Sequence, residues 1–164
     1  GDPELLFLDE PTTGLDPQSR RQTWEIVEQL KARGRTVLLT THYMEEAARL
    51  CDRVAVVDHG KVIALGTPRE LIASLGAEHV VEFAVGENAA GPLPENILRA
   101  LPSVEGVVHD GDTWRLTVRE VHRTVPALLA ALADRGAEPL HLATHHATLE
   151  DVFMTLTGRR LRDG

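Results

Sequence analysis

The first part of the chain alternates between short apolar runs and an amphipathic stretch. Residues 5–8 and Thr36–Thr40 form such runs, a pattern typical of parallel strands that are covered on both faces. The stretch between them repeats its apolar residues at helical spacing. Asp16 is placed to cap this helix, Pro17 fits its first position, and Gly34 fits its end. The pattern therefore predicts a strand, a helix and a second strand.

The next segments continue this alternation and then turn back on themselves. A helix is expected over Met44–Leu50, followed by an apolar strand over 54–57. The dipeptide His-Gly at 59–60 fits a tight turn into a strand over 61–65, which predicts a hairpin. A Thr-Pro-Arg-Glu capping box then opens a helix expected over 67–75.

Beyond Gly76 the elements are shorter. Residues 86–94 are rich in Gly, Ala, Asn and Pro and predict a loop, and a last helix is expected between a Thr148 cap and a Gly158 stop. Strands are expected around 81–85, 104–108, 114–118 and 140–143, and helices around 97–101 and 125–132. Pro126 fits its helix only in the first turn. The order strand, helix, two strands, helix, strand is the ferredoxin-like pattern.

Composition narrows the classes of function. With 43% hydrophobic and 26% charged residues, the 164-residue chain has an ordinary globular balance. The net charge of -8 is spread along the chain, which argues against nucleic acid as a direct partner. Cys51 is the single cysteine, so an internal disulfide is excluded. No stretch reaches the roughly 18 apolar residues of a membrane span, so any membrane-spanning partner is another chain.

The first predicted strand ends in two neighbouring carboxylates, Asp9 and Glu10. Ligands of open α/β folds bind at the carboxyl ends of parallel strands. One carboxylate there can hold Mg²⁺ through water while its neighbour orients or deprotonates an attacking water. Taken alone, the pair is better explained as two solvated acids at the end of a strand.

The residues around this pair carry a specific resemblance. The run LLFLDEPTTGLDP at 5–17 resembles the Walker B motif and D-loop of ABC ATPases, and Thr41-His42 after the next strand resembles their switch histidine. Three motifs in this order and at these intervals are far more specific than a lone motif.

The resemblance implies a role for each matching residue. Asp9 corresponds to the acid associated with Mg²⁺, and Glu10 to the general base or water-polarising residue. His42 corresponds to the side chain that contacts the γ-phosphate of ATP, although a histidine at the end of a strand can also serve only as a cap. Asp16 corresponds to the D-loop acid, which communicates across a nucleotide-sandwich dimer. These roles fit phosphoryl transfer, which depends on positioned charge.

Other motifs of the resembled family do not occur in the sequence. No G-x-x-x-x-G-K-[ST] loop is present, so the cradle for the β- and γ-phosphates is missing. The adenine-stacking aromatic, the glutamine loop and the LSGGQ-type signature are expected before Gly1. We therefore expect the chain to be part of a longer protein, to bind ATP weakly by itself and to be inactive alone.

The leading interpretation is the ATP-binding and ATP-hydrolysing subunit of an ABC exporter. Residues 1–76 resemble the C-terminal part of the P-loop ATPase core, an α/β fold. Residues 77–164 form a predicted ferredoxin-like α+β domain for regulation or dimerisation, and residues 149–159, LEDVFMTLTGR, are similar to the C-terminal domain of drug- and antibiotic-resistance export ATPases. The implied partners are a second ATPase subunit, as in a homodimer, and a separate transmembrane permease. The implied location is the cytoplasmic face of the cell membrane, to which the protein would be peripheral.

Two alternatives stay open at this point. One is a soluble ABC ATPase acting on ribosomes or DNA, although such proteins usually read Asn-His where this chain has Thr13-Gly14, and they carry basic extensions. The other is a module without catalytic activity that dimerises or senses a ligand, which rests on fold analogy alone. The transported substrate cannot be read from the sequence.

Further polar clusters are weaker candidates for function. His141, His145 and His146 are close enough in sequence to suggest a metal site, but a strand leading into a loop also explains them. Glu45 and Glu46 are interpreted as the solvated face of a helix.

Overall fold

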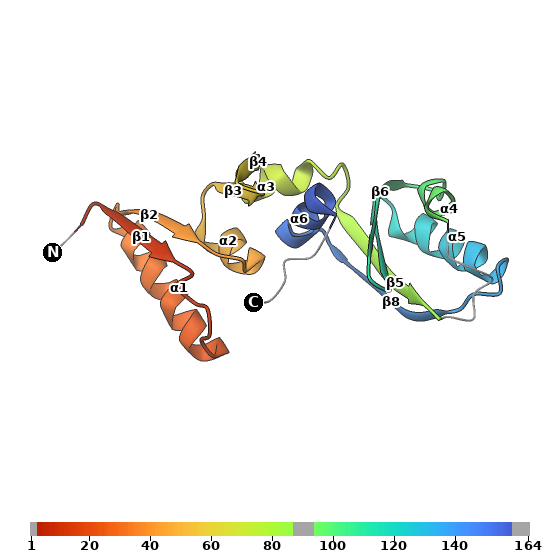
Figure 1. Cartoon of the computed structure of the whole chain (residues 1–164), viewed down its shortest axis with the longest axis horizontal. Coiled ribbons are helices and arrows are strands. Elements are labelled where there is room, and N and C mark those ends of the chain that lie inside the picture. The colour runs from red at the N-terminus through yellow and green to blue at the C-terminus, as the bar shows by residue number, and fades with distance from the viewer. Residues whose placement is uncertain (1–2, 87–93, 159–164) are drawn as a thin grey trace.

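The computed structural model describes residues 3–86 and 94–158. In Figure 1 residues 5–73 occupy one part of the long axis and the sheet and helices of residues 79–146 occupy the other, and the last helix returns to the middle of the molecule. The loop predicted over 86–94 falls mostly on residues 87–93, outside the described ranges. No helix within those ranges is long and apolar enough to span a membrane.

The N-terminal unit is the predicted strand, helix and strand. Strand β1 (Leu5–Asp9) pairs in parallel with β2 (Thr36–Thr40), and α1 (Pro17–Ala32) connects them. The Asp16 side chain accepts hydrogen bonds from the first turn of α1, as the sequence predicts. Gly34 lies just past the helix with a φ of 78°, a conformation that glycine adopts without a steric penalty.

The two faces of this strand pair differ. The inner face packs on α1 and on the next helix, α2 (Met44–Leu50), around three buried residues, Trp24, Val27 and Leu50. The outer face carries Leu5, Phe7 and Leu38, and Phe7 is 70% exposed. The prediction that these strands are covered on both faces is therefore wrong for the described residues, because α1 covers only one face.

A helix, a hairpin and a short helix follow. They are α2 (Met44–Leu50), β3 (Val54–Asp58), β4 (Lys61–Gly66) and α3 (Pro68–Ala73). The antiparallel pairing of Asp58 with Lys61 confirms the predicted two-residue turn. The capping box of α3 is also present, but the helix ends at Ala73, before the predicted residue 75.

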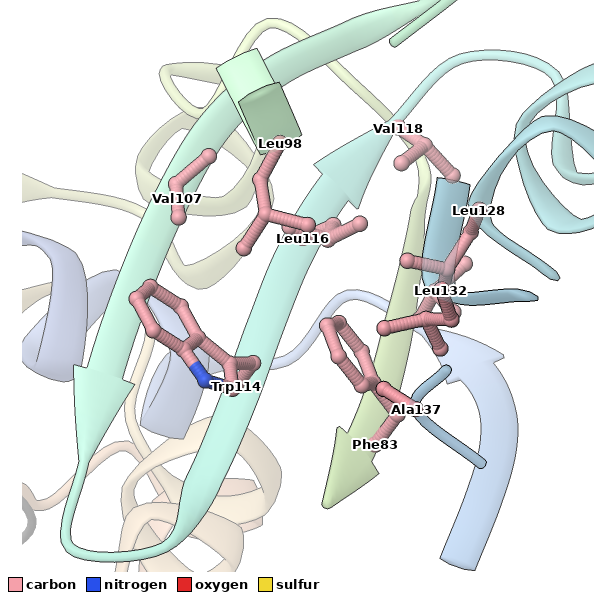
Figure 2. Close-up of a cluster of buried hydrophobic side chains, with 10 residues drawn as sticks. Phe83, Leu98, Val107, Trp114, Leu116, Val118, Leu128, Leu132 and Ala137 are labelled. Carbon is pink, nitrogen blue, oxygen red and sulfur yellow. The ribbon is translucent and has the colours of Figure 1, made fainter. Parts of the chain in front are cut away.

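The C-terminal unit contains the predicted order of elements in a four-stranded antiparallel sheet, with strand order β6-β7-β5-β8. Helices α4 and α5 cover one face of this sheet, where Phe83, Trp114 and Leu116 meet Leu98 and Leu128 (Figure 2). The elements are β5 (His79–Val85), α4 (Glu95–Arg99), β6 (Val104–Asp110), β7 (Thr113–Val118), α5 (Val121–Ala133) and β8 (Pro139–His146).

Pro126 lies inside α5, beyond its first turn, because the helix begins at Val121. The expectation of a first-turn proline is therefore wrong. Proline has no N–H and cannot donate to the carbonyl four residues earlier. The start of α5 is attached to the preceding segment by the buried Thr124 hydroxyl, which donates to the carbonyl of Pro102 at 2.7 Å.

The last helix, α6 (Leu149–Thr157), joins the two units. Its Thr148 cap donates a backbone hydrogen bond to Asp151 at 2.8 Å, and Gly158 ends the helix with a φ of 69°. Its buried face forms a shared core with the segment from α2 to α3, made of Ala47, Val56, Leu71, Leu149, Val152 and Phe153.

An ionic contact holds the start of α6 on the C-terminal sheet. Arg115 of β7 lies 2.8 Å from Glu82 and 3.1 Å from Asp151. The side chains of Arg115 and Asp151 are 11% and 4% exposed. Because alternate residues of a strand point to opposite faces, Arg115 and α6 lie on the face opposite α4 and α5.

Candidate functional site

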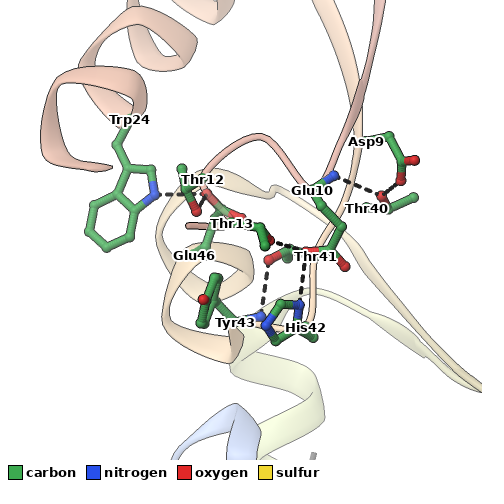
Figure 3. Close-up of polar contacts among 10 residues, drawn as sticks. All are labelled: Asp9, Glu10, Thr12, Thr13, Trp24, Thr40, Thr41, His42, Tyr43 and Glu46. Carbon is green, nitrogen blue, oxygen red and sulfur yellow. Dashed lines mark hydrogen bonds and ion pairs between the residues drawn. The ribbon is translucent and has the colours of Figure 1, made fainter. Parts of the chain in front are cut away.

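The candidate residues gather where β1 and β2 end (Figure 3). Asp9, the last residue of β1, pairs in register with Thr40, the last residue of β2. Since the strands are parallel, the residues that follow them, Glu10 and His42, emerge at the same edge. The candidate residues Asp9, Glu10 and His42 are therefore brought together by the register of one strand pair.

Glu10 and His42 are in direct contact. His42 Nδ1 lies 2.9 Å from Glu10 Oε2, and the hydroxyl of Thr13 donates to the same oxygen at 3.1 Å. Both side chains are partly exposed, at 24% for His42 and 37% for Glu10. Both contacts engage Oε2, so Oε1 is the oxygen through which Glu10 can accept a hydrogen bond from water.

The backbone of Glu10 is in the left-handed region, with a φ of 45°. This conformation is unfavourable for a residue with a side chain and persists where the surroundings enforce it. Here the Glu10 N–H donates to both the carbonyl and the hydroxyl of Thr40, each at 3.1 Å. The end of β2 therefore fixes the direction in which the Glu10 side chain leaves the strand.

Asp9 presents an oxygen ligand of the type that Mg²⁺ prefers. Its Oδ1 accepts a hydrogen bond from the hydroxyl of Thr40, which orients the carboxylate. Mg²⁺ is usually held by one or two carboxylates together with water and phosphate oxygens. The described residues contain no cluster of three or more His, Cys, Asp or Glu that could enclose a metal. A single oriented carboxylate at a sheet edge nevertheless fits Mg²⁺ bound with a nucleotide.

Asp16 lies outside this group. Its Oδ1 accepts from the N–H groups of Gln18 at 2.9 Å and Ser19 at 3.1 Å, and its Oδ2 accepts from the Ser19 hydroxyl at 2.5 Å. These hydrogen bonds, led by the one from the Ser19 hydroxyl, lower the pKa of Asp16. Within the chain, the described contacts of Asp16 are those of a helix cap.

Glu46 contradicts the interpretation of a solvated helix face. Glu45 is exposed, but Glu46 is fully buried, with 0% exposure. Its Oε1 accepts from Trp24 Nε1 at 2.9 Å and from the Thr12 hydroxyl at 2.8 Å. Helical spacing could have suggested that Glu46 is buried, because it falls between Tyr43 and Leu50 on the inward side of the helix. Acidic residues are rarely buried, however, so the sequence favours a solvated position.

The three histidines near the C-terminus share no site. His145 lies 3.4 Å from Asp151, whereas the ring of His146 contacts that of His79 in a tilted arrangement, with 4.7 Å between the ring centroids. Neighbouring residues of a strand point to opposite faces, so His145 and His146 point away from each other. His141, four residues before His145, pairs with Ala84 of β5.

Comparison with protein-family models gives no match. The chain is 43% identical to the Nod factor export ATP-binding protein I of Ralstonia nicotianae, covering 99% of this chain and 49% of that protein. It is 41% identical to the linearmycin resistance ATP-binding protein LnrL of Bacillus subtilis, over 98% of this chain and 52% of that protein. It is 43% identical to the daunorubicin/doxorubicin resistance ATP-binding protein DrrA of Streptomyces peucetius, over 98% of this chain and 48% of that protein. The chain thus spans about half the length of the curated relatives it matches.

A solved structure described as an ATP-binding subunit of an ABC transporter is also similar. It is 36% identical to this chain and covers 46% of it, corresponding to 31% of the solved chain, with a TM-score of 0.42. Agreement at this level is too low for an argument about the fold.

Proposed function

This chain is a homologue of the ABC transporter ATP-binding proteins of the Nod factor export and drug resistance type, and we propose that it carries the water-activating end of an ATP-hydrolysing site. The observation that carries the proposal is the contact between Glu10 and His42 beside Asp9, at the shared end of two parallel strands. Phosphoryl transfer requires positioned charge at such an edge.

Each side chain has a proposed part in the reaction. Glu10 orients the attacking water and accepts its proton, through the oxygen that His42 and Thr13 leave unengaged. His42 contacts the γ-phosphate, and its contact with Glu10 keeps the ring beside the attacking water. Asp9 would hold Mg²⁺ through water, and the ion would neutralise charge on the phosphates. Asp16 contributes to a dimer of ATPase subunits from its position at the start of α1.

A groove beside β2 offers a place for a strand that would lead into the missing phosphate loop. It has a volume of about 540 Å³ and lies between β2 and β3, with Leu38, His42 and Val56 among its lining residues. Within the described residues, β2 pairs only with β1, and β3 only with β4. We propose that this groove is filled by a strand that corresponds to the half of the relatives that this chain does not match. A loop following that strand would then reach the edge where Glu10 and His42 lie.

The finer assignment of fold and partners belongs to the same proposal. Residues 1–76 are the C-terminal part of a P-loop ATPase core, and 77–164 are a ferredoxin-like domain, which the strand order β6-β7-β5-β8 supports. The complete protein pairs with a second ATPase subunit and drives export through a separate transmembrane permease, at the cytoplasmic face of the membrane. ATP binding closes the dimer, and hydrolysis reopens it.

A chimera tests this function. It joins this chain to the part of the Ralstonia nicotianae relative that this chain does not match. We expect the chimera to hydrolyse ATP. We expect Glu10→Gln to lower kcat by about a hundredfold to ten-thousandfold, the usual contribution of a general base, while ATP binding persists and a closed dimer accumulates.

Glu25→Gln is the matched control, because it makes the same chemical change on an exposed position of α1. Near-normal hydrolysis by the Glu10→Gln chimera would remove Glu10 from the role of base.

A further inference from the structure

Glu46 is a buried acidic residue for which the proposed reaction has no direct use. It belongs to α2, and its Oε1 accepts hydrogen bonds from Trp24 of α1 and from Thr12 in the loop after β1. Its Oε2 is also buried and has no hydrogen-bond partner among the described residues. One carboxyl group therefore connects three segments that are 22 and 34 residues apart in sequence.

Such a group is costly if packing is its only purpose. Burying a carboxyl oxygen without a partner loses its hydration, and an apolar side chain of similar volume would avoid that loss. Buried polar groups are retained in some proteins because they select one arrangement of the surrounding segments. The question is which arrangement Glu46 selects.

One partner of Glu46, Thr12, lies in the loop beside the candidate site, and the other, Trp24, is held by a further side chain. Thr12 is followed by Thr13, whose hydroxyl donates to Glu10 Oε2, the oxygen that His42 also contacts. Trp24 is held on a ring face by Arg49, whose guanidinium carbon lies 5.0 Å from the ring centroid, so its N–H has a defined direction.

A second contact connects the same helices closer to His42. The guanidinium of Arg20 in α1 lies 4.4 Å from the ring centroid of Tyr43, the residue that precedes α2. The Tyr43 ring in turn lies 4.2 Å from that of His42. Helices α1 and α2 are therefore joined by two separate contacts, one through Glu46 and Trp24 and one through Arg20 and Tyr43.

We propose that Glu46 is a positioning residue that sets the separation between the Glu10 carboxylate and the His42 ring. By bonding Thr12, it fixes the loop that supports Glu10, and by belonging to α2 it fixes the helix that follows His42. Its importance for hydrolysis rests on the proposed function, whereas its effect on the geometry does not.

NMR of the 164-residue chain tests the geometry without nucleotide. The two tryptophans give separate indole N–H signals, and Trp114 in the C-terminal core serves as an internal control. We expect Glu46→Leu to shift the Trp24 indole signal and the backbone amide signals of Glu10, Thr13 and His42. Glu46→Gln keeps a carbonyl oxygen that can accept both hydrogen bonds, so these signals should stay close to their original positions.

Thr12→Val is the second variant, in case Glu46→Leu does not fold. It removes only the hydroxyl bonded to Glu46 and preserves the side-chain shape. We expect it to shift the signals of Glu10, Thr13 and His42. The proposal is overturned if these signals stay in place in Thr12→Val, or if Glu46→Leu moves only the Trp24 signal. It is also overturned if Glu46→Gln moves the site signals as far as Glu46→Leu.

The chimera adds a kinetic readout. Displacing reacting groups by about 1 Å costs on the order of a hundredfold in rate, so Glu46→Leu should lower kcat by about tenfold to a hundredfold while KM for ATP changes little. Glu46→Gln should recover most of this loss. If the chimera is inactive even without substitution, the proposed function fails, and the NMR comparison still decides the role of Glu46.

Discussion

The orientation of individual side chains at the candidate site depends on hydrogen bonds to a few oxygen atoms. The Thr40 hydroxyl donates to Asp9 and accepts from the Glu10 N–H, so a single residue of β2 orients both the last residue of β1 and the acid that follows it. His42 and Thr13 then restrict the Glu10 carboxylate from the other side. Asp16 is oriented differently, because the first turn of α1 engages both of its oxygens.

The Asp16 cap makes a prediction about pH. Because hydrogen bonds from Ser19 and Gln18 lower the pKa of Asp16 below its ordinary value of 3.8, its charged form stabilises the folded state. This stabilisation is complete at pH values above the ordinary pKa, and it is lost as the pH falls through the lowered pKa of Asp16. We expect Asp16→Ala to reduce the urea midpoint at neutral pH, and the gap from the unsubstituted chain to close in acid.

Asp16→Asn is the control, because asparagine caps a helix as well as aspartate but does not titrate. Its urea midpoint should match that of the unsubstituted chain at neutral pH. A gap between Asp16→Ala and the unsubstituted chain that stays constant into the acid range would contradict the assigned source of stability.

At the scale of elements, helix α6 connects the N-terminal and C-terminal parts of the molecule. Its buried face completes a core with α2, β3 and α3, while Asp151 in its first turn pairs with Arg115 of the C-terminal sheet. One short helix thus contacts both units through two kinds of interaction, apolar on one side and ionic on the other. Movement of either unit relative to the other would have to break one of them.

Substitutions in α6 test this arrangement. Phe153 is buried in the shared core, and truncating a buried phenylalanine to alanine typically costs about 3–5 kcal/mol. We expect Phe153→Ala to lower the free energy of unfolding by that amount in urea titrations followed by circular dichroism. Leu156 on the same helix is 46% exposed, so Leu156→Ala should cost less than about 1 kcal/mol. Equal effects of the two variants would show that α6 does not dock as described.

At the scale of the whole molecule, the strand edge proposed for catalysis is present, whereas the sequence contains no phosphate cradle. His42, which contacts Glu10, lines a groove between β2 and β3, and the outer face of β1 and β2 exposes Phe7 and Leu38. The sequence contains no glycine-rich loop with a lysine that could hold the β- and γ-phosphates. Most of the binding energy for ATP should therefore come from outside these 164 residues.

Calorimetry can measure this directly. We expect titration of ATP and Mg²⁺ into the 164-residue chain to give no micromolar binding, and titration into the chimera to give it. Because the two proteins share Glu10 and His42, the difference reports the contribution of the added segment. Micromolar affinity of the chain alone would contradict the view that its nucleotide site is incomplete.

Much of the fold was predictable because its determinants are local. An Asp-Pro start at 16–17, a capping box at Thr67 and a glycine stop at 158 act on backbone groups within a turn of themselves, and the structure contains all three. The proximity of Asp9, Glu10 and His42 was also predictable, because two parallel strands in register bring the residues that follow them to one edge.

Other features depended on contacts between distant segments, which no local pattern encodes. The burial of Glu46 requires Trp24 and Thr12 to arrive from elsewhere in the chain, and the left-handed backbone of Glu10 requires Thr40 opposite it. The docking of α6 on the core between α2 and α3 follows from packing across the two units. Local sequence patterns are therefore sufficient to specify the helices, the strands and the acidic residues at the end of β1. How these acidic residues are held in place depends on tertiary contacts, because the energies that hold them come from burial and hydrogen bonds between segments far apart in the chain.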